Sequence, residues 1–423
     1  MKDPGTEGQT LEPLEMARKL IETPSTSSSG TEIYDLVFEL LKERCPGTVW
    51  MGSKSRYLEY SDFRNVYAKV GSGKGPKIML NCHLDTVDPG NGWTESPFSA
   101  IEKNGRIYGL GAADMKGGSA CAIASFLDMA SRDGNLNGEL YISCVFGEEA
   151  PYSLGTDTLL SELDMSDFDL VIIPEPSPLL GIYDHCVVHK RIHGSRFPVV
   201  IVGAEGRVLF EVEFFGKASH ASHPSQGINA LHDASRFITE LTRFDLFSSI
   251  KMGRGHYVVL NVDGGDHSFT VPSYCKLLVN RQLTLGEDEK KALREVQDIA
   301  RSLKLRSKVK IKKRYSPSPE LEYRPYLYES SRYLDMFLEH VPVPPYGRSR
   351  KKCLFTTSSV GDFNLFGTRT NVPTVIYGPG GGNIHSPNEF VNCSEIIQVK
   401  DHLTGFLMEA FDIGKISENT HRP

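Results

Sequence analysis

The sequence predicts an α/β protein: a mostly parallel sheet with helices on both faces, interrupted by a smaller inserted α+β domain. Two observations carry this prediction. Short apolar segments alternate with helical patterns in the first half of the chain and again near its end, which is typical of a covered parallel sheet. Near residue 207 the pattern changes to alternating polar and apolar residues, as expected of half-exposed antiparallel strands.

The first part of the α/β domain alternates helix and strand. Helices are predicted where apolar residues recur at helical spacing or where small apolar residues run without interruption, and strands where an apolar run is short. The predicted helices are Leu11 to Thr23, Glu32 to Arg44 and Lys116 to Ala130, and the predicted strands are 77–81, 140–146 and 170–173.

The inserted domain is predicted at residues 206–314, so that the α/β domain consists of residues 1–205 and 315–423. The insertion has the order strand, helix, two strands, helix, strand, and the α/β pattern resumes after it. Its strands are predicted at 207–215, 257–262, 274–281 and 308–314 and its helices at 229–242 and 288–303; helices at 330–340 and 394–411 and a strand at 373–377 follow.

Composition excludes several classes of protein. The net charge of -6 argues against a nucleic-acid partner, because such proteins are usually basic. No apolar run reaches 18 residues, so no membrane span is predicted. The segment Met1 to Gln9 lacks a basic start followed by an apolar stretch, and we therefore expect no secretory signal. The eight cysteines form no CxxC pair and are expected to be reduced thiols in a cytoplasmic protein.

Histidines and carboxylates follow the predicted strands. In an open α/β sheet, sites form beyond the carboxyl ends of the strands, and these ends share one edge of the sheet. We therefore expect the polar residues that follow the strands to converge there, together with a segment that leads into the helix at 116. These residues are His83, Asp85, Asp114, Glu148, Glu149, Glu175 and His385, with a glycine loop at 378–382 that contains Gly380.

Two divalent metal ions account for this set of side chains better than one. Imidazole nitrogens and carboxylate oxygens both bind zinc. One metal would leave carboxylates unused, whereas two metals that share a bridging carboxylate use them all. Such a pair lowers the pKa of a water molecule and polarises a carbonyl group, and a carboxylate outside the ligand set then takes the proton.

Six motifs then resemble one metallopeptidase family, the family of acetylornithine deacetylase, succinyl-diaminopimelate desuccinylase, aminoacylase and bacterial glutamate carboxypeptidase. They occur in the family's order across nearly the whole chain, and their combination is far more specific than any one of them. The motifs are His83 to Thr86, Gly109 to Gly118, Gly147 to Glu149, Pro174 to Pro176, Gly216 to His220 and His385 to Glu389.

The resemblance implies a role for each catalytic-domain residue. Asp114 bridges the two metals, His83 and Glu175 complete one ligand set, and Glu149 and His385 complete the other. Glu148 is implied as general base and later as proton donor to the leaving amine. Asp85 is implied to orient His83, since a histidine ligand commonly donates its other N–H to a carboxylate. The family uses zinc, and cobalt or manganese also fits such a site.

The inserted domain resembles the family's lid and dimerisation domain, which implies a homodimer. His220 then matches a histidine that reaches the partner's site and stabilises an oxyanion. Arg281 matches an arginine that binds a substrate carboxylate, for which its planar fork is suited. Gly380 and its neighbours would offer N–H groups to the substrate, a small molecule with a carboxylate.

Several interpretations stay open on the sequence alone. Asp114 is also a plausible N-cap for the helix that follows it, Arg281 a partner for Glu287 or Asp288, and His223 a substitute for His220. The glutamate at 175 favours a deacylase or carboxypeptidase over a dipeptidase or exopeptidase. The third alternative is a catalytically silent relative that binds a ligand.

The chain also departs from the family. Residues 182–202 form a longer segment than usual, and Phe269 stands where relatives often carry an asparagine. His185, His189 and His193 have the spacing of one helix face. Their β-branched neighbours favour a strand instead, and we therefore expect no metal at these histidines.

Overall fold

The computed structural model describes residues 12–26, 29, 31–54, 63–149, 153–180, 182–184, 190–192, 197–246, 248–249, 251–265, 269–314, 322–342 and 355–412. The chain divides into two compact units: a first unit of Met1–Gly203 and Leu327–Pro423, and a second unit, Ala204–Tyr326. The second unit extends beyond residue 314 because Tyr323 returns to its sheet, where its carbonyl accepts the Arg207 N–H at 2.8 Å.

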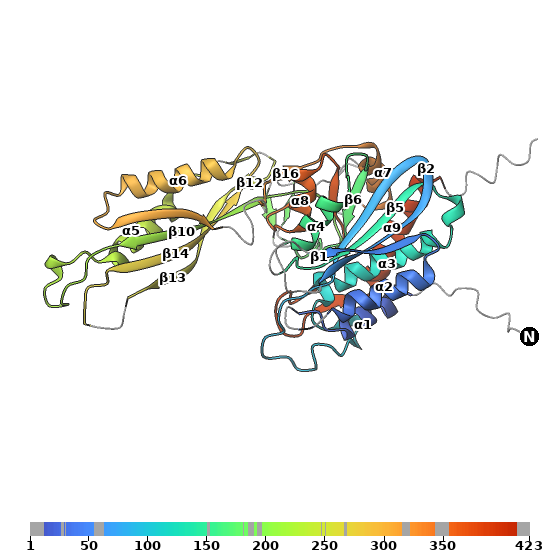
Figure 1. Ribbon diagram of the computed structural model, residues 1–423, viewed down its shortest axis with the longest axis horizontal. Helices are drawn as coiled ribbons and strands as arrows, with labels where there is room; N and C mark the ends of the chain where they lie inside the picture. The colour runs from blue at the N-terminus through green and yellow to red at the C-terminus, as the bar shows by residue number, and fades with distance from the viewer. Residues whose placement is uncertain are drawn as a thin grey trace, which may run out of the picture. The chain divides into compact units, whose positions relative to one another are not determined.

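The first unit is built on a sheet of ten strands among the described residues (Figure 1). Its centre is parallel: β6 (Leu170–Ile173) pairs in parallel with β18 (Thr374–Ile376) and with the end of β2 (Arg64–His83). Antiparallel strands flank this centre, with β1 (Thr48–Lys54) next to β2 and β9 (Ile201–Ala204) next to β18. The predicted α/β class is confirmed, and the strands that the sequence did not predict lie mainly outside the parallel centre.

Strand β2 bends back on itself around β5 (Asn137–Val145). Its first half pairs in descending register, from Val66 opposite Cys144 to Gly71 opposite Glu139. Its second half pairs in ascending register, from Lys77 opposite Glu139 to His83 opposite Val145. Both edges of β5 are therefore covered by one continuous strand, and the parallel half of β2 ends at His83.

The longer segment predicted at 182–202 adds strands at one edge of the sheet. β7 (Ile182–Asp184) pairs antiparallel with both β8 (Lys190–Ile192) and β17 (Phe355–Thr357). A further short strand, β16 (Tyr326–Leu327), pairs with β9. His185, His189 and His193, for which we expected no metal, lie outside the described residues.

Two groups of helices pack against the sheet. In the first group α3 contacts α1, α2 and α9; in the second α4 contacts α8, and α8 contacts β18. Nearly every residue of α3 is buried, because its small side chains let the helix fit between its neighbours and the sheet. The helices are α1 (Pro13–Glu22), α2 (Glu32–Arg44), α3 (Gly117–Ala130), α4 (Leu154–Glu162), α7 (Arg332–His340), α8 (Asp362–Arg369) and α9 (Cys393–Ala410). None of the helices in the described part of the chain is both long and apolar enough to cross a membrane.

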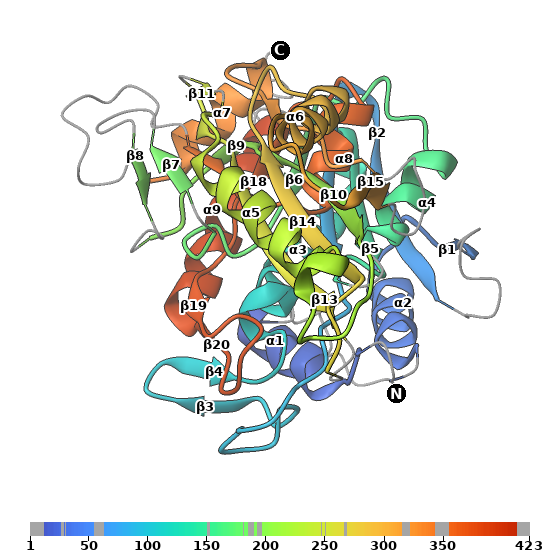
Figure 2. The same ribbon diagram turned by 90° about the vertical axis from the view of Figure 1, so that its left-hand side faces the viewer.

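A small antiparallel sheet connects two loops that matter below. Its strand order is β19-β20-β4-β3, and Figure 2 shows these strands side by side. Strand β4 leads into the short π-helical turn η1 (Ala112–Lys116), and the β19–β20 connection contains His385. The strands are β3 (Ile101–Lys103), β4 (Arg106–Tyr108), β19 (Gly381–Gly382) and β20 (Phe390–Asn392).

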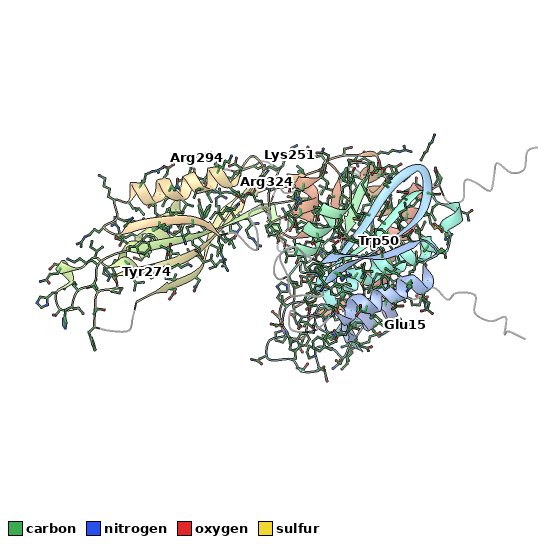
Figure 3. All side chains as sticks on the ribbon, viewed as in Figure 1. Glu15, Trp50, Lys251, Tyr274, Arg294 and Arg324 are labelled. Atoms are coloured by element: carbon green, nitrogen blue, oxygen red, sulfur yellow. The ribbon has the colours of Figure 1, made fainter. Side chains whose placement is uncertain are left out.

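The second unit is a four-stranded antiparallel sheet in the order β13-β14-β10-β15, covered by two helices. Residues of one strand face, such as Phe210 and Phe214, pack with Phe237 in a buried core. Each buried side chain of this kind contributes about 1.5–3 kcal/mol. Figure 3 shows Arg294 on the outer face of α6. The elements are β10 (Gly206–Phe215), η3 (Pro224–Gln226), α5 (Ala230–Arg243), β11 (Ser248–Ser249), β12 (Gly253–Arg254), β13 (His256–Gly264), β14 (Tyr274–Leu283), α6 (Glu289–Ser302) and β15 (Lys308–Arg314).

Candidate metal centre

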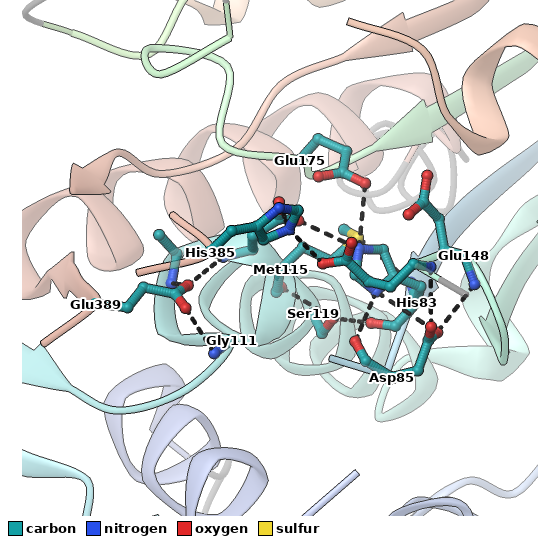
Figure 4. A network of polar contacts seen from close by, with 12 residues as sticks. His83, Asp85, Gly111, Met115, Ser119, Glu148, Glu175, His385 and Glu389 are labelled. Carbon is teal, nitrogen blue, oxygen red and sulfur yellow. Dashed lines mark hydrogen bonds and ion pairs between the residues drawn. The ribbon is translucent and has the colours of Figure 1, made fainter. Parts of the chain in front are cut away.

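Five of the predicted ligands meet at one edge of the first unit's sheet (Figure 4). His83 is the last residue of β2, and Glu149 and Glu175 follow the ends of β5 and β6. Asp114 lies in the turn η1, and His385 comes from the β19–β20 connection. The convergence follows from the topology, because the carboxyl ends of parallel strands share one edge.

The ligand atoms form two groups that share Asp114. One group is His83, Asp114 and Glu175, and the other is Asp114, Glu149 and His385; within each group the ligand atoms lie within 4.8 Å of one another. Asp114 Oδ1 is 3.3 Å from His83 Nε2, and Asp114 Oδ2 is 3.5 Å from His385 Nε2. One carboxylate thus presents one oxygen to each group, which is the geometry of a bridging ligand.

The spacing of these atoms suits zinc. Ligand atoms about 2.0–2.2 Å from a tetrahedral zinc ion lie about 3.3–3.6 Å from each other. His83 Nε2 is 3.3 Å from Asp114 and 3.4 Å from Glu175 Oε1, as two such pairs would be. His385 Nε2 and Glu149 Oε1 are closer, at 2.8 Å, which is a hydrogen-bond distance. The nitrogen and oxygen donors are of the type that zinc binds.

The charges of the centre also call for cations. Burial raises the pKa of Glu175 to about 7, and the neighbouring Asp114 adds to the effect. Burial and Asp114 likewise raise the pKa of Glu149 well above its usual range. Burial alone would lower the pKa of His83, but the carboxylates of Asp114 and Glu175 outweigh it and raise the pKa. Carboxylates at this density are costly to ionise without a positive partner.

The local backbone brings Asp114 into this position. Gly111 has a φ of 72°, which favours glycine, and a Cβ there would lie 2.4 Å from Thr86 Cγ2. Asp114 itself has φ -119° and ψ 95°, outside the helical region. Helix α3 starts after Lys116 with no side-chain cap. The alternative interpretation of Asp114 as the N-cap of that helix is therefore wrong.

Asp85 contacts both His83, the partner that the sequence suggested, and the turn that follows β5. Its carboxylate accepts the backbone N–H groups of Glu148 at 3.1 Å and Glu149 at 2.9 Å. His83 Nδ1 lies 3.7 Å from that carboxylate but 3.0 Å from the backbone carbonyl of Asp85. Donation of Nδ1–H to this carbonyl leaves the lone pair on Nε2, the atom that faces the cluster.

Glu148 stands beside the ligands without belonging to either group. Figure 4 shows its side chain pointing away from Asp85, toward the side on which Glu175 lies. Burial raises the pKa of Glu148 well above its usual range, and the carboxylates of Asp362 and Glu149 add to the effect. A raised pKa favours a group that must take a proton and later return it.

The other predicted site residues, His220, Gly380 and Arg281, belong to neither ligand group. His220 is exposed in the second unit, and its Nδ1 contacts Ser222 Oγ at 2.7 Å. The same hydroxyl lies 2.9 Å from His223 Nδ1, so the two histidines share one partner. Gly380 belongs to the first unit, where its N–H is donated to Glu395 Oε2 at 2.7 Å.

Arg281 is fully buried inside the second unit. Its Nη2 lies 2.6 Å from Glu287 Oε1 and 3.2 Å from Glu295 Oε2. Its guanidinium also stacks over Tyr257, 5.1 Å from the ring centroid. Of the two interpretations that the sequence left open, this geometry is that of the ion pair with Glu287. Phe269, in contrast, is 86% exposed.

Sequence reasoning gave no role to several buried ionisable residues near the ligands, among them Glu389 and Lys116. Glu389 ends a recognised motif and is 1% exposed, with contacts to the backbone around Asp114. Lys116 is fully buried, and its Nζ donates to the Thr23 carbonyl at 2.9 Å. The charge of Lys116, directly before a run of small apolar residues, is the feature of the sequence that could have indicated it. Neither residue stands directly after a strand, which was the criterion applied.

Comparison with known proteins points to one family. Residues 79–409 match the sequence model described as Peptidase family M20/M25/M40. A succinyl-diaminopimelate desuccinylase from a Nitratiruptor species is 23% identical over 393 residues, covering 91% of this chain and 96% of the relative.

Solved structures share the fold. A tripeptidase from Staphylococcus aureus subsp. aureus mu50 has a TM-score of 0.74 and 18% sequence identity, with 96% of this chain and 99% of that chain covered. A dinuclear metal binding peptidase of the M20 family from Bacillus subtilis has a TM-score of 0.65 and 15% identity, with coverage of 95% and 98%.

Proposed function

We propose, from the premise that this chain belongs to peptidase family M20/M25/M40, that it cleaves the amide bond of an N-acyl amino acid or a short peptide next to a carboxylate. Membership makes the chain a metal-dependent hydrolase of amide bonds; the substrate class is our proposal. The observation that carries the proposed two-cation hydrolysis is the position of Asp114, which places one oxygen in each of two ligand groups.

The residues have distinct tasks in this reaction. Two divalent cations, zinc with cobalt or manganese as substitutes, would be held by His83, Glu175, Glu149, His385 and the shared Asp114. When bound, such a pair lowers the pKa of water and polarises the scissile carbonyl.

Glu148 is the proposed general base. It lies next to the ligand Glu149 in the chain but outside both ligand groups, so its carboxylate is free to accept a proton from water. The water oxygen adds to the carbonyl carbon, the C–N bond breaks, and Glu148 returns the proton to the nitrogen, so that a carboxylic acid and a neutral amine are the products. Asp85 holds the turn that carries Glu148 and Glu149 and thereby fixes the position of the base.

A deacylase or carboxypeptidase is the favoured type. The desuccinylase relative covers almost the whole chain, and a desuccinylase removes an acyl group from an amino acid. Glu175, where an aspartate is expected of dipeptidases, favours the same type. The alternative, an exopeptidase on free peptides, is supported by the tripeptidase that shares the fold.

The proposal includes a homodimer formed by the second unit. β13 is an edge strand of its sheet, and it exposes Val258, Leu260 and Val262 to between 41% and 54%. Unpaired apolar edge strands favour addition of another strand. A second copy would supply one. In that dimer, His220 is the candidate for reaching a partner's site, as the family resemblance implies.

We place the enzyme in the cytoplasm. Six cysteines of the described residues are free and buried, and Cys82 Sγ lies 3.5 Å from Cys144 Sγ without a bond between them. Free thiols this close are typical of a reducing compartment.

Substitution of Glu148 by glutamine tests the function. The variant should bind two metal ions as the wild type does and lose at least about a hundredfold in kcat, as expected for removal of a general base. Glu43→Gln, an exposed position on α2, is the control. Amine release would be measured from N-acetyl amino acids, N-succinyl amino acids and free di- and tripeptides, with zinc- and cobalt-loaded protein.

The panel distinguishes the alternatives. Turnover of acyl amino acids supports the deacylase, and turnover of peptides alone supports the exopeptidase. Metal-loaded wild-type protein that cleaves nothing in the panel would instead indicate a catalytically silent binding protein. A Glu148→Gln variant with wild-type turnover would mean that the base is misassigned.

A further inference from the structure

Glu389 binds the backbone of the turn that carries Asp114 (Figure 4). Its Oε2 accepts the N–H of Gly111 at 2.9 Å, and its Oε1 accepts those of Ala113 at 2.9 Å and Asp114 at 3.0 Å. The Glu389 carbonyl also accepts the N–H of Gly109 at 3.0 Å. One residue therefore binds four N–H groups between positions 109 and 114.

These contacts fix a backbone segment that is neither regular helix nor strand. Gly111 is left-handed, and both Asp114 and Met115 have non-helical dihedral angles inside the turn. Amide groups in such an irregular buried segment need partners other than those of a helix or sheet. The buried carboxylate of Glu389 provides them from a segment that is distant in the sequence.

The same residue connects both sources of ligands. Glu389 follows His385 by four positions in the connection between β19 and β20. It therefore aligns the loop of His385 with the turn of Asp114. Because Asp114 places one oxygen in each ligand group, its orientation affects both groups at once.

We propose that Glu389 is a positioning residue that sets the orientation of Asp114 toward both metal ions without touching metal or substrate. The inference rests on the proposed function, because it takes Asp114 and His385 to be metal ligands. It adds a member to the site that neither ligand chemistry nor strand-end position would identify. Substitution of Glu389 should weaken the binding of both metal ions, whereas substitution of a residue that supports a ligand of one group should weaken the binding of one.

Glu389→Gln isolates the contact. The amide keeps the size of the side chain, but its NH₂ group cannot accept a hydrogen bond. At least one of the N–H groups of Gly111, Ala113 and Asp114 therefore loses its partner. Metal-free wild type and variant would be titrated with Co²⁺ and with Zn²⁺ by calorimetry, and the cobalt absorption spectrum recorded. We expect both binding events to weaken about tenfold to a hundredfold, as for other partners of metal ligands, and the cobalt spectrum to change.

A matched control separates this effect from general destabilisation. Asp169 also accepts a backbone N–H, that of Lys77 at 2.9 Å, where the second half of β2 begins. Asp169→Asn should lower thermal stability without changing either metal affinity or the spectrum. Glu389→Asp keeps the charge but shortens the reach, and it should fall between glutamine and wild type.

The outcomes distinguish the inference from its premise. Wild-type affinity for both metals and an unchanged spectrum in folded Glu389→Gln would overturn the role of Glu389 alone. Wild-type protein that takes up no metal would overturn the proposed function, and the inference with it. If the variants do not fold, amide hydrogen exchange is measured on the metal-free wild type. Slow exchange at 111, 113 and 114 supports the role of Glu389, and fast exchange contradicts it.

Discussion

The carboxylate of Asp85 accepts the backbone N–H group of Glu149 at 2.9 Å. Asp85 lies two residues beyond His83, which belongs to one ligand group, whereas Glu149 belongs to the other. The segment from His83 to Asp85 thus provides a member of the first group and a backbone contact for the second. The following predictions depend on this arrangement and on the shared Asp114.

Asp85→Asn should weaken the group that contains Glu149 more than the group that contains His83. The asparagine keeps one acceptor oxygen and presents an NH₂ group to the other N–H, so the turn after β5 loses one contact. We expect a tenfold to hundredfold loss in affinity for one metal, about the size known for such partners. Stepwise cobalt titration measures it, and equal loss at both steps would count against the assignment.

Asp114→Asn and Glu175→Gln should differ in the number of metals lost. Asp114 is a member of both ligand groups, whereas Glu175 is a member of one. We expect the Asp114 variant to retain less than one tightly bound metal and the Glu175 variant to retain one. Elemental analysis after dialysis gives the number directly. Retention of two metals by Asp114→Asn would contradict the bridging role.

Removal of metal should lower the thermal stability of the first unit. Each ion binds only the folded arrangement of ligands, and at a hundredfold excess over its Kd it contributes about 2.7 kcal/mol. A chelator should therefore lower Tm, and added Zn²⁺ or Co²⁺ should restore it, as followed by calorimetry. The Asp114→Asn variant is the control, because its Tm should respond little to chelation.

Arg281→Ala should destabilise the second unit. Removing the arginine takes the nearer cation, at 2.6 Å, from the buried carboxylate of Glu287 and leaves Lys291 Nζ at 3.8 Å. Breaking a buried pair in this way costs about 3–5 kcal/mol. Arg301→Ala, in an exposed pair with Asp298, should change stability by less than about 1 kcal/mol. Chemical denaturation measures both. A raised KM with unchanged stability would favour the substrate role that the family resemblance implies.

Val262→Lys should separate the proposed dimer into monomers. Val262 is half exposed on the edge strand β13, and a lysine on an edge opposes pairing with a second strand. Leu36→Lys, at an exposed apolar position on α2 of the first unit, is the control. Light scattering after size-exclusion chromatography gives the masses. A dimer that persists in Val262→Lys would place the interface elsewhere.

The sequence predicted those parts of the fold that carry strong periodicity. Glu32–Arg44 is a helix with the predicted bounds and 170–173 is strand β6, whereas the run at 140–146 falls on β5, which begins three residues earlier and ends one residue earlier. The first half of β2 was missed because its residues are not a continuous apolar run, although several are buried against β5. Helix α8 was missed because its first turn is buried by the fold and carries no amphipathic pattern.

The sequence indicated those site residues that follow predicted strands, and it missed residues that reach the site in another way. His83, Glu149 and Glu175 stand just after predicted strands, so the topology alone brings them together. Glu389 acts through backbone contacts with a distant turn, and no spacing in the sequence reports such a contact. The contact of Asp85 with the turn after β5 likewise joins segments about sixty residues apart, and no spacing in the sequence reports it.

The threading of β5 between the two halves of β2 has a consequence for assembly. The halves are close in sequence, yet in the folded protein they do not pair with each other as a hairpin, because β5 lies between them. That segment emerges only after α3. During synthesis both halves of β2 are therefore made before the strand that lies between them, and the pairing of His83 with Val145 forms only once β5 has been made. Unpaired strand edges in a partly folded chain are prone to aggregation, and β5 covers two such edges at once.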